Sequence, residues 1–231
     1  MQVILLAIDM GPLWLTFKLA VITTVLLLIL GIPLAYWLAY SSSRSRFIVE
    51  TLVSMPLVLP PTVIGFYLLL AFSPGSGFGL WLDQWLGIRL VFSFEGLVVG
   101  SIIYSLPFMV QPIRAGLVNL PVNLMEASDL LGKSGLTTLR QVLLPNIKSS
   151  LLTATVLTFA HTVGEFGVVL MIGGSIPEVT KVASIAIYEE VESLNYASAN
   201  TYSAILFVIT FVILLVLNLT NGGYFKGLWK W

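Results

Sequence analysis

The chain has 231 residues, of which 58% are hydrophobic and only 10% are charged, and its formal net charge is zero. Soluble domains are usually about half apolar and about a quarter charged, so this composition excludes an ordinary soluble protein and predicts that most of the chain lies in lipid. The absence of cysteine excludes disulfides, thiolate metal sites and cysteine nucleophiles. The single histidine, His161, leaves no histidine-rich metal site, and the balanced charge gives no indication of a nucleic-acid partner.

Hydrophobic segments long enough to cross a bilayer occur five times. A membrane-spanning helix needs about 20 mostly apolar residues. The segments that satisfy this are 12–40, 47–72, 94–117, 149–172 and 201–219. The first is so long that it must tilt, bend or extend beyond the bilayer. We therefore predict an all-α, polytopic membrane protein with about five transmembrane helices, forming a single transmembrane domain over residues 1–231.

The distribution of basic residues predicts the orientation. Cytoplasmic connections carry an excess of lysine and arginine. With the N-terminus outside, three basic residues fall on the outer side and eight on the inner side, the inner ones being Arg44, Arg46, Arg114, Lys133, Arg140, Lys148, Lys226 and Lys230. We therefore expect the N-terminus outside, the C-terminus inside, and the polar segment 119–148 in the cytoplasm. No internal repeat is visible, which weakens the alternative of a secondary transporter built from inverted repeats.

The second span contains three prolines within six residues, in the stretch Met55-Pro-Leu-Val-Leu-Pro-Pro-Thr-Val-Ile-Gly65. Proline inside a span leaves backbone carbonyls unpaired, which lipid tolerates only where neighbouring chains or a water-filled path satisfy them. Three prolines exceed what a packing kink requires. The candidates for a pore or gate in this segment are Pro60, Pro61, Thr62 and Gly65.

The polar segment 119–148 has the features of a docking element. Asn123 is placed to cap a helix, with Glu126 three residues later able to complete a capping box. Gly132 suits the left-handed residue after the last turn. Ser134 and Gly135 predict a turn into a second helix. Pro145 prevents that helix from continuing straight. The alternative is an ordinary connection between two spans.

The fourth span contains Phe-Ala-His161-Thr-Val-Gly164-Glu165-Phe166-Gly167. An ionisable residue inside a span is a functional candidate by default. For Glu165 we expect a structural or gating role, either paired with a basic group such as Lys18 or Lys181 or accepting backbone N–H groups near the glycines. One turn earlier, His161 could donate a hydrogen bond to Glu165 or be a neutral core histidine. The pore or gate candidates here are His161, Gly164, Glu165, Phe166 and Gly167.

Glu126-Ala127-Ser128, with Gly132 six residues after the glutamate and Leu144-Pro145 beyond it, resembles the EAA motif of permease subunits in bacterial and archaeal ABC importers. The resemblance implies a type I importer permease whose short cytoplasmic coupling helix sits in a cleft of an ATPase subunit. Ser128 stands where the family commonly has a second alanine, a change small enough to be tolerated. The residues implied in ATPase coupling are Asn123, Glu126, Ala127, Ser128, Gly132, Leu144 and Pro145.

The proline-rich stretch of the second span and the Gly-Glu-Phe-Gly stretch of the fourth closely resemble those of molybdate permeases, and more distantly those of sulfate and thiosulfate permeases. The resemblance implies a homodimeric permease in the cytoplasmic (inner) membrane that moves molybdate by ATP-driven alternating access. Its other expected partners are a cytoplasmic ATPase dimer and an extracellular or periplasmic oxyanion-binding protein. The chain has no Walker motif, so ATP and Mg²⁺ would be used by the partner and this chain would bind no cofactor or metal and would not be an enzyme.

Other functions remain open at this level. The same machine could carry tungstate, sulfate or thiosulfate. An ATP-independent secondary anion transporter or channel would want fixed positive charge at mid-membrane, and none is securely placed there. An assembly protein would not need prolines and a glutamate inside spans. A translocation path must let the anion leave, so we expect a largely uncharged pore lined by serine, threonine and glycine dipoles.

Overall fold

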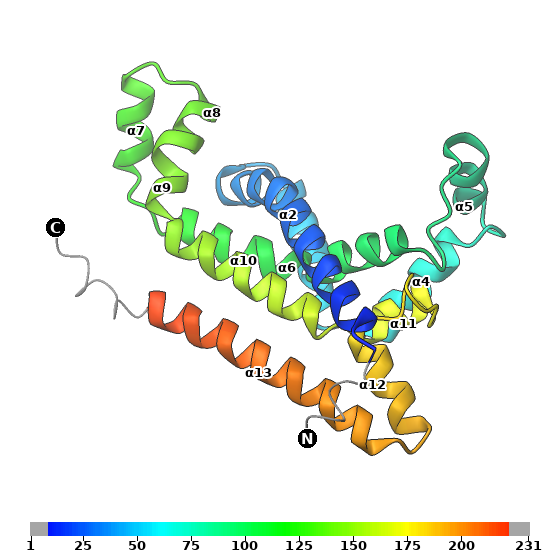
Figure 1. Cartoon of the computed structure of the whole chain (residues 1–231). Helices are drawn as coiled ribbons and strands as arrows, with labels where there is room; N and C mark the ends of the chain where they lie inside the picture. Colours follow the sequence, from blue (N-terminus) through cyan, green and yellow to red (C-terminus); the bar gives the residue numbers. More distant parts are fainter. Residues whose placement is uncertain (1–8, 222–231) are drawn as a thin grey trace.

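The computed structural model describes residues 9–221, which form helices and connecting turns with no strand in that range (Figure 1). Lys226 and Lys230, which were counted on the inner side, lie outside the described residues. In chain order the helices are α2 (Gly11–Tyr40), α3 (Ser45–Ser54), η1 (Met55–Leu57), α4 (Pro61–Phe72), α5 (Gly77–Trp81), η2 (Leu82–Leu86), α6 (Phe94–Val118), α7 (Asn123–Leu130), α8 (Gly135–Thr138), η3 (Leu139–Leu143), α9 (Leu144–Asn146), α10 (Lys148–Val163), α11 (Gly167–Gly173), α12 (Ala183–Glu192) and α13 (Tyr196–Asn221).

Helices α2, α6 and α10 pack against one another and form the centre of the molecule. Small residues permit the close approach: a Cβ on Gly31 would lie 2.8 Å from Met109 Cγ, and one on Gly116 would lie 2.5 Å from Ser150 Oγ. The Tyr40 hydroxyl donates a 2.9 Å hydrogen bond to the Leu117 carbonyl, which ties the last turns of α2 and α6 together. The three helices therefore form a rigid frame that carries the shorter segments.

Buried apolar side chains form separate clusters toward the two ends of this frame. One cluster joins the last turns of α2 and α6 to the polar segment, with Leu38, Leu117 and Leu143 fully buried. Another lies at the opposite end, where Leu97 and Ile185 pack around the first half of α2. The polar segment and the α12 end are thus each anchored to the frame by a core of their own.

The prediction of about five spans is confirmed, with a correction to their form. Within residues 9–221, three single helices are long and apolar enough to cross a membrane: Gly11–Tyr40, Phe94–Val118 and Tyr196–Leu219. Two more spans exist only if each of two bent helix pairs counts as one, namely Ser45–Leu57 with Pro61–Phe72, bent by 113°, and Gly135–Asn146 with Lys148–Val163, bent by 81°. The second predicted span, 47–72, is therefore not one continuous helix, because consecutive prolines at 60 and 61 remove backbone donors and block the helix.

The fourth predicted span is also interrupted. Helix α10 ends at Val163 and α11 begins at Gly167, leaving residues 164–166 outside any helix. Helix α4 has 12 residues, which gives a length of about 18 Å, and α11 is shorter still. Neither can cross a hydrocarbon core of about 30 Å alone. The second and fourth spans therefore each contain a half-helix.

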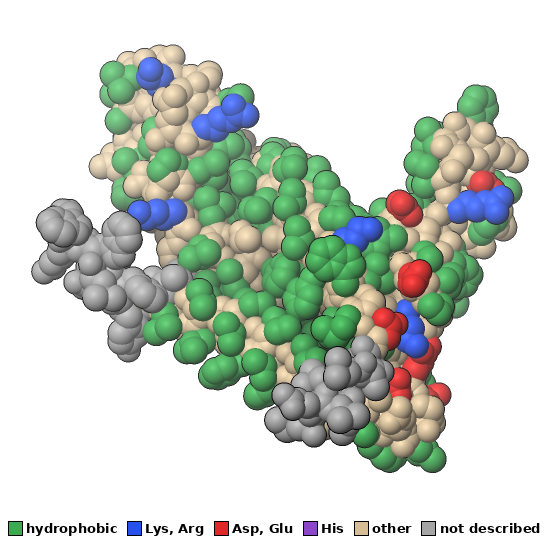
Figure 2. All heavy atoms as spheres, viewed as in Figure 1, with side chains coloured by type: hydrophobic (Ala, Val, Ile, Leu, Met, Phe, Trp, Pro, Cys, Tyr) green, Lys and Arg blue, Asp and Glu red, His purple; other side chains and the backbone are tan. Residues whose placement is uncertain are grey.

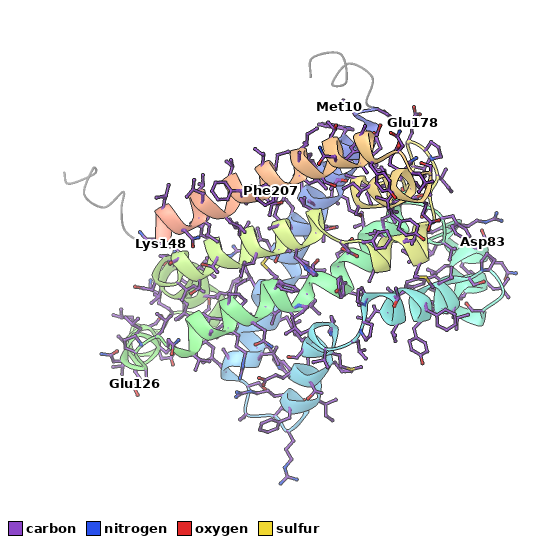
Figure 3. The ribbon with its side chains drawn as sticks, turned by 90° about the horizontal axis from the view of Figure 1, so that it is seen from below. Met10, Asp83, Glu126, Lys148, Glu178 and Phe207 are labelled. Carbon is purple, nitrogen blue, oxygen red and sulfur yellow. The ribbon has the colours of Figure 1, made fainter. Side chains whose placement is uncertain are left out.

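The two ends of the molecule differ in charge. Figure 2 shows basic side chains over the α7–α9 end and most acidic ones over the opposite end, around α12 and α5. Figure 3 places Glu126 and Lys148 at the first end and Met10, Asp83 and Glu178 at the second, with Phe207 on α13 between them. Only 11% of the apolar window of α13 is buried, and Phe207 is 72% exposed. This apolar surface requires lipid or another chain as its surroundings.

Candidate functional site

Residues 123–146 fold into a pair of antiparallel helical segments, here named the docking hairpin, which projects from the frame (Figure 1). The turn between them depends on Gly132, which has φ +66° and donates its N–H to the Asp129 carbonyl at 2.9 Å. Only glycine adopts this left-handed conformation at little cost. The second segment starts at Gly135, where the Ser134 side chain accepts a hydrogen bond from the Thr137 N–H. The predicted left-handed glycine and the predicted turn are both confirmed.

A buried hydrogen bond closes the hairpin. The hydroxyls of Ser128 on α7 and Thr138 on α8 lie 2.7 Å apart, and both residues are only 3% exposed. A buried hydroxyl needs a partner, and Thr138 supplies one to Ser128, while the Thr138 hydroxyl also donates to the Ser134 carbonyl at 3.2 Å. The sequence reasoning treated Ser128 only as a tolerated replacement for alanine and missed this role. The one signal for this role in the sequence was the hydroxyl of Ser128 at a position where the permease family commonly has alanine.

The outer surface of the docking hairpin is apolar and hollowed. A cavity of about 210 Å³ runs between its two segments, with Leu124, Ala127 and Leu131 on one wall. These three residues, spaced three and four apart along the chain, therefore lie on one face of the hairpin. Leu130 is 89% exposed, Leu131 75% and Leu136 59%. Leucines this exposed at the end of a helical projection are typical of a surface that another protein covers.

The predicted capping box is wrong. Helix α7 begins at Asn123 itself, the preceding residue is Val122, and no side chain caps the first turn. Asn123 and Glu126 are both exposed, and Glu126 sits in the first turn, where the helix dipole favours a negative charge. The chain turns from Pro121 directly into α7 through backbone bonds from Leu124 to Pro121 and from Glu126 to Val122, so no side-chain cap is needed. Glu126 is thus free to contact a partner.

The base of the hairpin is fixed to the frame. Leu143 is fully buried and Leu139 is 8% exposed, whereas Leu144 is half-buried and Pro145 exposed. The 81° bend between Gly135–Asn146 and Lys148–Val163 follows directly after this proline. The hairpin therefore has a rigid connection to α10, as Pro145 predicted.

The second group of candidates brings together two half-helices from distant parts of the sequence. Helices α4 and α11 pack side by side, and their contact depends on two glycines. A Cβ on Gly65 would lie 2.7 Å from Met171 Cβ and 3.0 Å from Val168 Cα, and one on Gly167 would lie 3.0 Å from Pro61 Cβ. Next to this contact Pro60 and Thr62 are exposed. The proline-rich stretch and the Gly-Glu-Phe-Gly stretch thus form one structural unit.

Glu165 occupies the break between α10 and α11 and is 3% exposed. Neither of its carboxyl oxygens has a hydrogen-bond partner among the described residues. The predicted pairing with Lys18 or Lys181 is wrong, because Lys18 lies over the Phe94 ring at 4.4 Å and Lys181 pairs with Glu189. The main chain at this break is held instead by Ser184, whose hydroxyl donates to the Glu165 carbonyl at 2.6 Å.

His161 does not donate to Glu165. Its ring stacks on Phe108, with centroids 3.9 Å apart, and lies 4.8 Å from Tyr104, while its Nε2 has no hydrogen-bond partner in residues 9–221. Its environment is that of a histidine packed among aromatic rings. Gly164 is exposed and Phe166 is half-buried beside Tyr188.

Hydroxyl side chains lie within the central helices, but they are sealed from the surface. Ser105 and Thr162 are 3.0 Å apart, and Thr23, Ser101 and Thr158 are each fully buried. A pore lined by serine and threonine stays a prediction, because these hydroxyls face the interior of a single chain. Residues 9–221 contain no group of three or more histidine and acidic side chains able to hold a metal.

Comparison with known proteins identifies the family. Residues 31–223 match the model of the binding-protein-dependent transport system inner membrane component. The chain belongs to this family. It is 44% identical, over 90% of its length and 92% of the relative's, to the molybdenum transport system permease protein ModB of Azotobacter vinelandii. It is 32% identical, over 88% of its length and 70% of the relative's, to the "Probable sulfate transport system permease protein cysT" of Marchantia polymorpha.

The fold agrees with this assignment. A similar fold is found in the structure of a bacterial alginate ABC transporter in complex with a periplasmic protein bound to an alginate pentasaccharide. The match has a TM-score of 0.73 and 20% sequence identity, and it covers 90% of this chain and 76% of that chain. A likeness at this identity concerns the fold. The chain is therefore a multi-pass membrane permease subunit of an ABC importer, with the type I permease fold.

Proposed function

We propose that this chain is the permease subunit of an importer that moves molybdate across the cytoplasmic membrane, powered by a separate ATPase. The observation that supports the substrate most directly is the 44% identity, over nine-tenths of the chain, with a relative named as a molybdenum permease. The docking hairpin supports the coupling to an ATPase. Its exposed apolar side chains offer a surface for another protein to bind, and its rigid base can pass the movement of that protein on to α10.

In this proposal the docking hairpin sits in a cleft of the ATPase subunit on the cytoplasmic side. The surplus of basic side chains at that end is the arrangement expected on the inner side of a membrane. Leu130 and Leu131 would supply the apolar contact, and Glu126 a charged one. ATP and Mg²⁺ would be bound by the partner alone.

Two copies of the chain would enclose the pathway. ATP-driven closure of the ATPase dimer would pull the two docking hairpins together and rotate α10, which each hairpin joins through the bend after Pro145. The α4–α11 unit would move with the frame and open the path outward, where a binding protein delivers the oxyanion. Hydrolysis would reverse the motion. The N-terminus would lie outside and the C-terminus inside.

The coupling is tested by co-purification in detergent with the co-expressed ATPase, comparing wild type with Gly132→Pro. Proline cannot adopt φ +66° and lacks the N–H that bonds Asp129, so the hairpin turn is lost while the spans remain. Gly87→Pro is a matched control: Gly87 has φ +64° and donates to Asp83 at 3.1 Å, but at the opposite end. We expect Gly132→Pro to lose the ATPase and Gly87→Pro to keep it. Failure of the wild type to bind any ATPase would favour an ATP-independent transporter.

The substrate is tested separately in proteoliposomes that contain the ATPase complex and the binding protein. We expect ATP-dependent uptake of labelled molybdate that excess unlabelled molybdate abolishes. Tungstate, sulfate and thiosulfate are added as competitors in turn. Stronger competition by sulfate or thiosulfate than by molybdate would assign the importer to that anion instead.

A further inference from the structure

A cavity of about 640 Å³ opens at the bend between α3 and α4 and combines apolar walls with two arginines. Phe47, Met55 and Val58 form part of the apolar wall. Arg46 enters from the start of α3, and Arg114 reaches in from α6. Leu59, also at its wall, directly precedes Pro60 and Pro61. The cavity therefore adjoins the proline-rich segment at the start of the half-helix α4.

Glu50 stands between the two arginines. Its carboxylate bonds Arg114 Nη1 at 2.7 Å and lies 3.9 Å from Arg46 Nε. If the only role of Glu50 were to link α3 to α6 through an ion pair, Arg114 alone would be sufficient and no cavity would be needed. Here two positive charges face one negative charge, so the cavity keeps a net positive charge.

The arginines keep donors that nothing in the described chain accepts. The Nε groups of Arg46 and Arg114 are buried and lack a hydrogen-bond partner. Their side chains are only 27% and 22% exposed. A guanidinium offers five N–H donors in a planar fork that matches a tetrahedral oxyanion, and buried donors without a partner are costly. Because the Nε groups are covered by other atoms, an anion in the cavity would meet the partly exposed Nη donors of the two arginines. One Nη of each is already bonded, that of Arg46 to the Ser41 carbonyl and that of Arg114 to Glu50, and the other is left for an anion.

We propose that this cavity binds a tetrahedral oxyanion group through Arg46 and Arg114, and that Glu50 is a built-in competitor that keeps the binding weak. The inference rests on the proposed function, in which an oxyanion leaving the α4 segment next meets this cavity on the cytoplasmic side. A site on an exit path must release its anion, and a resident carboxylate achieves this by occupying the arginines whenever the anion departs.

The test measures binding of labelled molybdate to the purified permease–ATPase complex in nanodiscs, without ATP and without the binding protein. Glu50→Gln removes the competitor, so molybdate binding should tighten by about tenfold, whereas Arg114→Gln should weaken it by about tenfold. Arg44→Gln is the control, since Arg44 is exposed, lies two residues before Arg46 and does not line the cavity, so this change should leave the affinity unchanged. Tighter binding in Glu50→Gln cannot result from misfolding. ATP-driven uptake by that variant should be slower, because release is delayed.

A lipid phosphate has the same chemistry, so the nanodiscs are made from phosphatidylcholine with and without phosphatidylglycerol, and retained lipid is measured by native mass spectrometry. Molybdate affinities that shift as described in both lipids support the site and assign it to the free anion. Phosphatidylglycerol that is retained by the wild type and lost in Arg114→Gln supports the site and assigns it to lipid. Unchanged molybdate binding and unchanged lipid in all variants overturn the inference. Wild-type uptake on the same preparation judges the proposed function independently.

Discussion

The contact between the half-helices α4 and α11 can be tested by placing a side chain where only glycine fits. In Gly65→Val, the new Cβ would lie 2.7 Å from Met171 Cβ and 3.0 Å from Val168 Cα, atoms that cannot swing away as the tip of a flexible chain would. Carbon atoms prefer separations of about 3.5 to 4.0 Å, so the two helices must move apart by roughly 1 Å.

Overpacking of this kind costs about 1 to 3 kcal/mol, and the better helix propensity of valine over glycine offsets only a few tenths of a kcal/mol. For a chain of this size, each kcal/mol lowers Tm by about 2 to 4 °C, so we expect a decrease of about 2 to 10 °C. Because the strain falls on the pore or gate candidates, transport should also decrease. The measurements are thermal unfolding of the purified permease–ATPase complex and ATP-driven uptake in proteoliposomes.

Gly77→Val is the matched control, because nothing lies within 4 Å of a Cβ at Gly77. It should unfold and transport like the wild type. If Gly65→Val also behaves like the wild type, the close packing of α4 on α11 through Gly65 is refuted, and with it the view that the two motifs form one unit.

Three further predictions concern other parts of the chain. Ser128→Ala removes the hydrogen bond between the two segments of the docking hairpin, which is worth about 0.5 to 1.5 kcal/mol, although the Thr138 hydroxyl keeps its 3.2 Å bond to the Ser134 carbonyl. Amide exchange in residues 123–146 should therefore accelerate and ATPase affinity should fall, whereas unchanged exchange would contradict the closing role of this bond. Tyr40→Phe removes the hydrogen bond to the Leu117 carbonyl and should lower Tm by about 1 to 5 °C. Tyr67→Phe, at an exposed tyrosine, is the control and should leave Tm unchanged. Equal effects of the two changes on Tm would refute a specific role of Tyr40. Burial acts to raise the pKa of Glu189, but its ion pair with Lys181 helps to lower that pKa below the usual glutamate value. The stability gained from this pair is therefore present above the usual glutamate pKa and is lost as pH falls through the lowered value. Lys181→Met should weaken that acid dependence of Tm, and an identical pH profile would count against the pairing.

Features governed by local chemistry could be predicted from the sequence. The low charge content determined that the chain belongs in a membrane, because no arrangement of so few charges covers a soluble surface. Gly132 predicted a left-handed turn and Pro145 a bend, since each constrains its own backbone wherever it stands. The prolines at 60 and 61 indicated a break, although the sequence gives no measure of its 113° angle.

The capping box at Asn123 failed for a reason that local patterns cannot reveal. Helix starts are chosen by the path of the chain entering them, and here the turn from Pro121 satisfies the first donors with backbone carbonyls. The expected partners of Glu165 failed similarly: Lys18 and Lys181 are each held by a nearer neighbour, Phe94 and Glu189.

Tertiary structure alone decided which distant residues meet. Gly65 faces Met171, Ser128 bonds Thr138, and Arg114 joins Glu50 at the cavity beside the α3–α4 bend. The contact of Arg114 with Glu50 depends on how α3 packs against α6, and that of Gly65 with Met171 on how α4 packs against α11, whereas Ser128 and Thr138 meet through the turn at Gly132. The sequence determines which hydrogen bonds, charges and apolar surfaces each residue can offer. Which other residue it contacts is determined by how the helices pack in three dimensions.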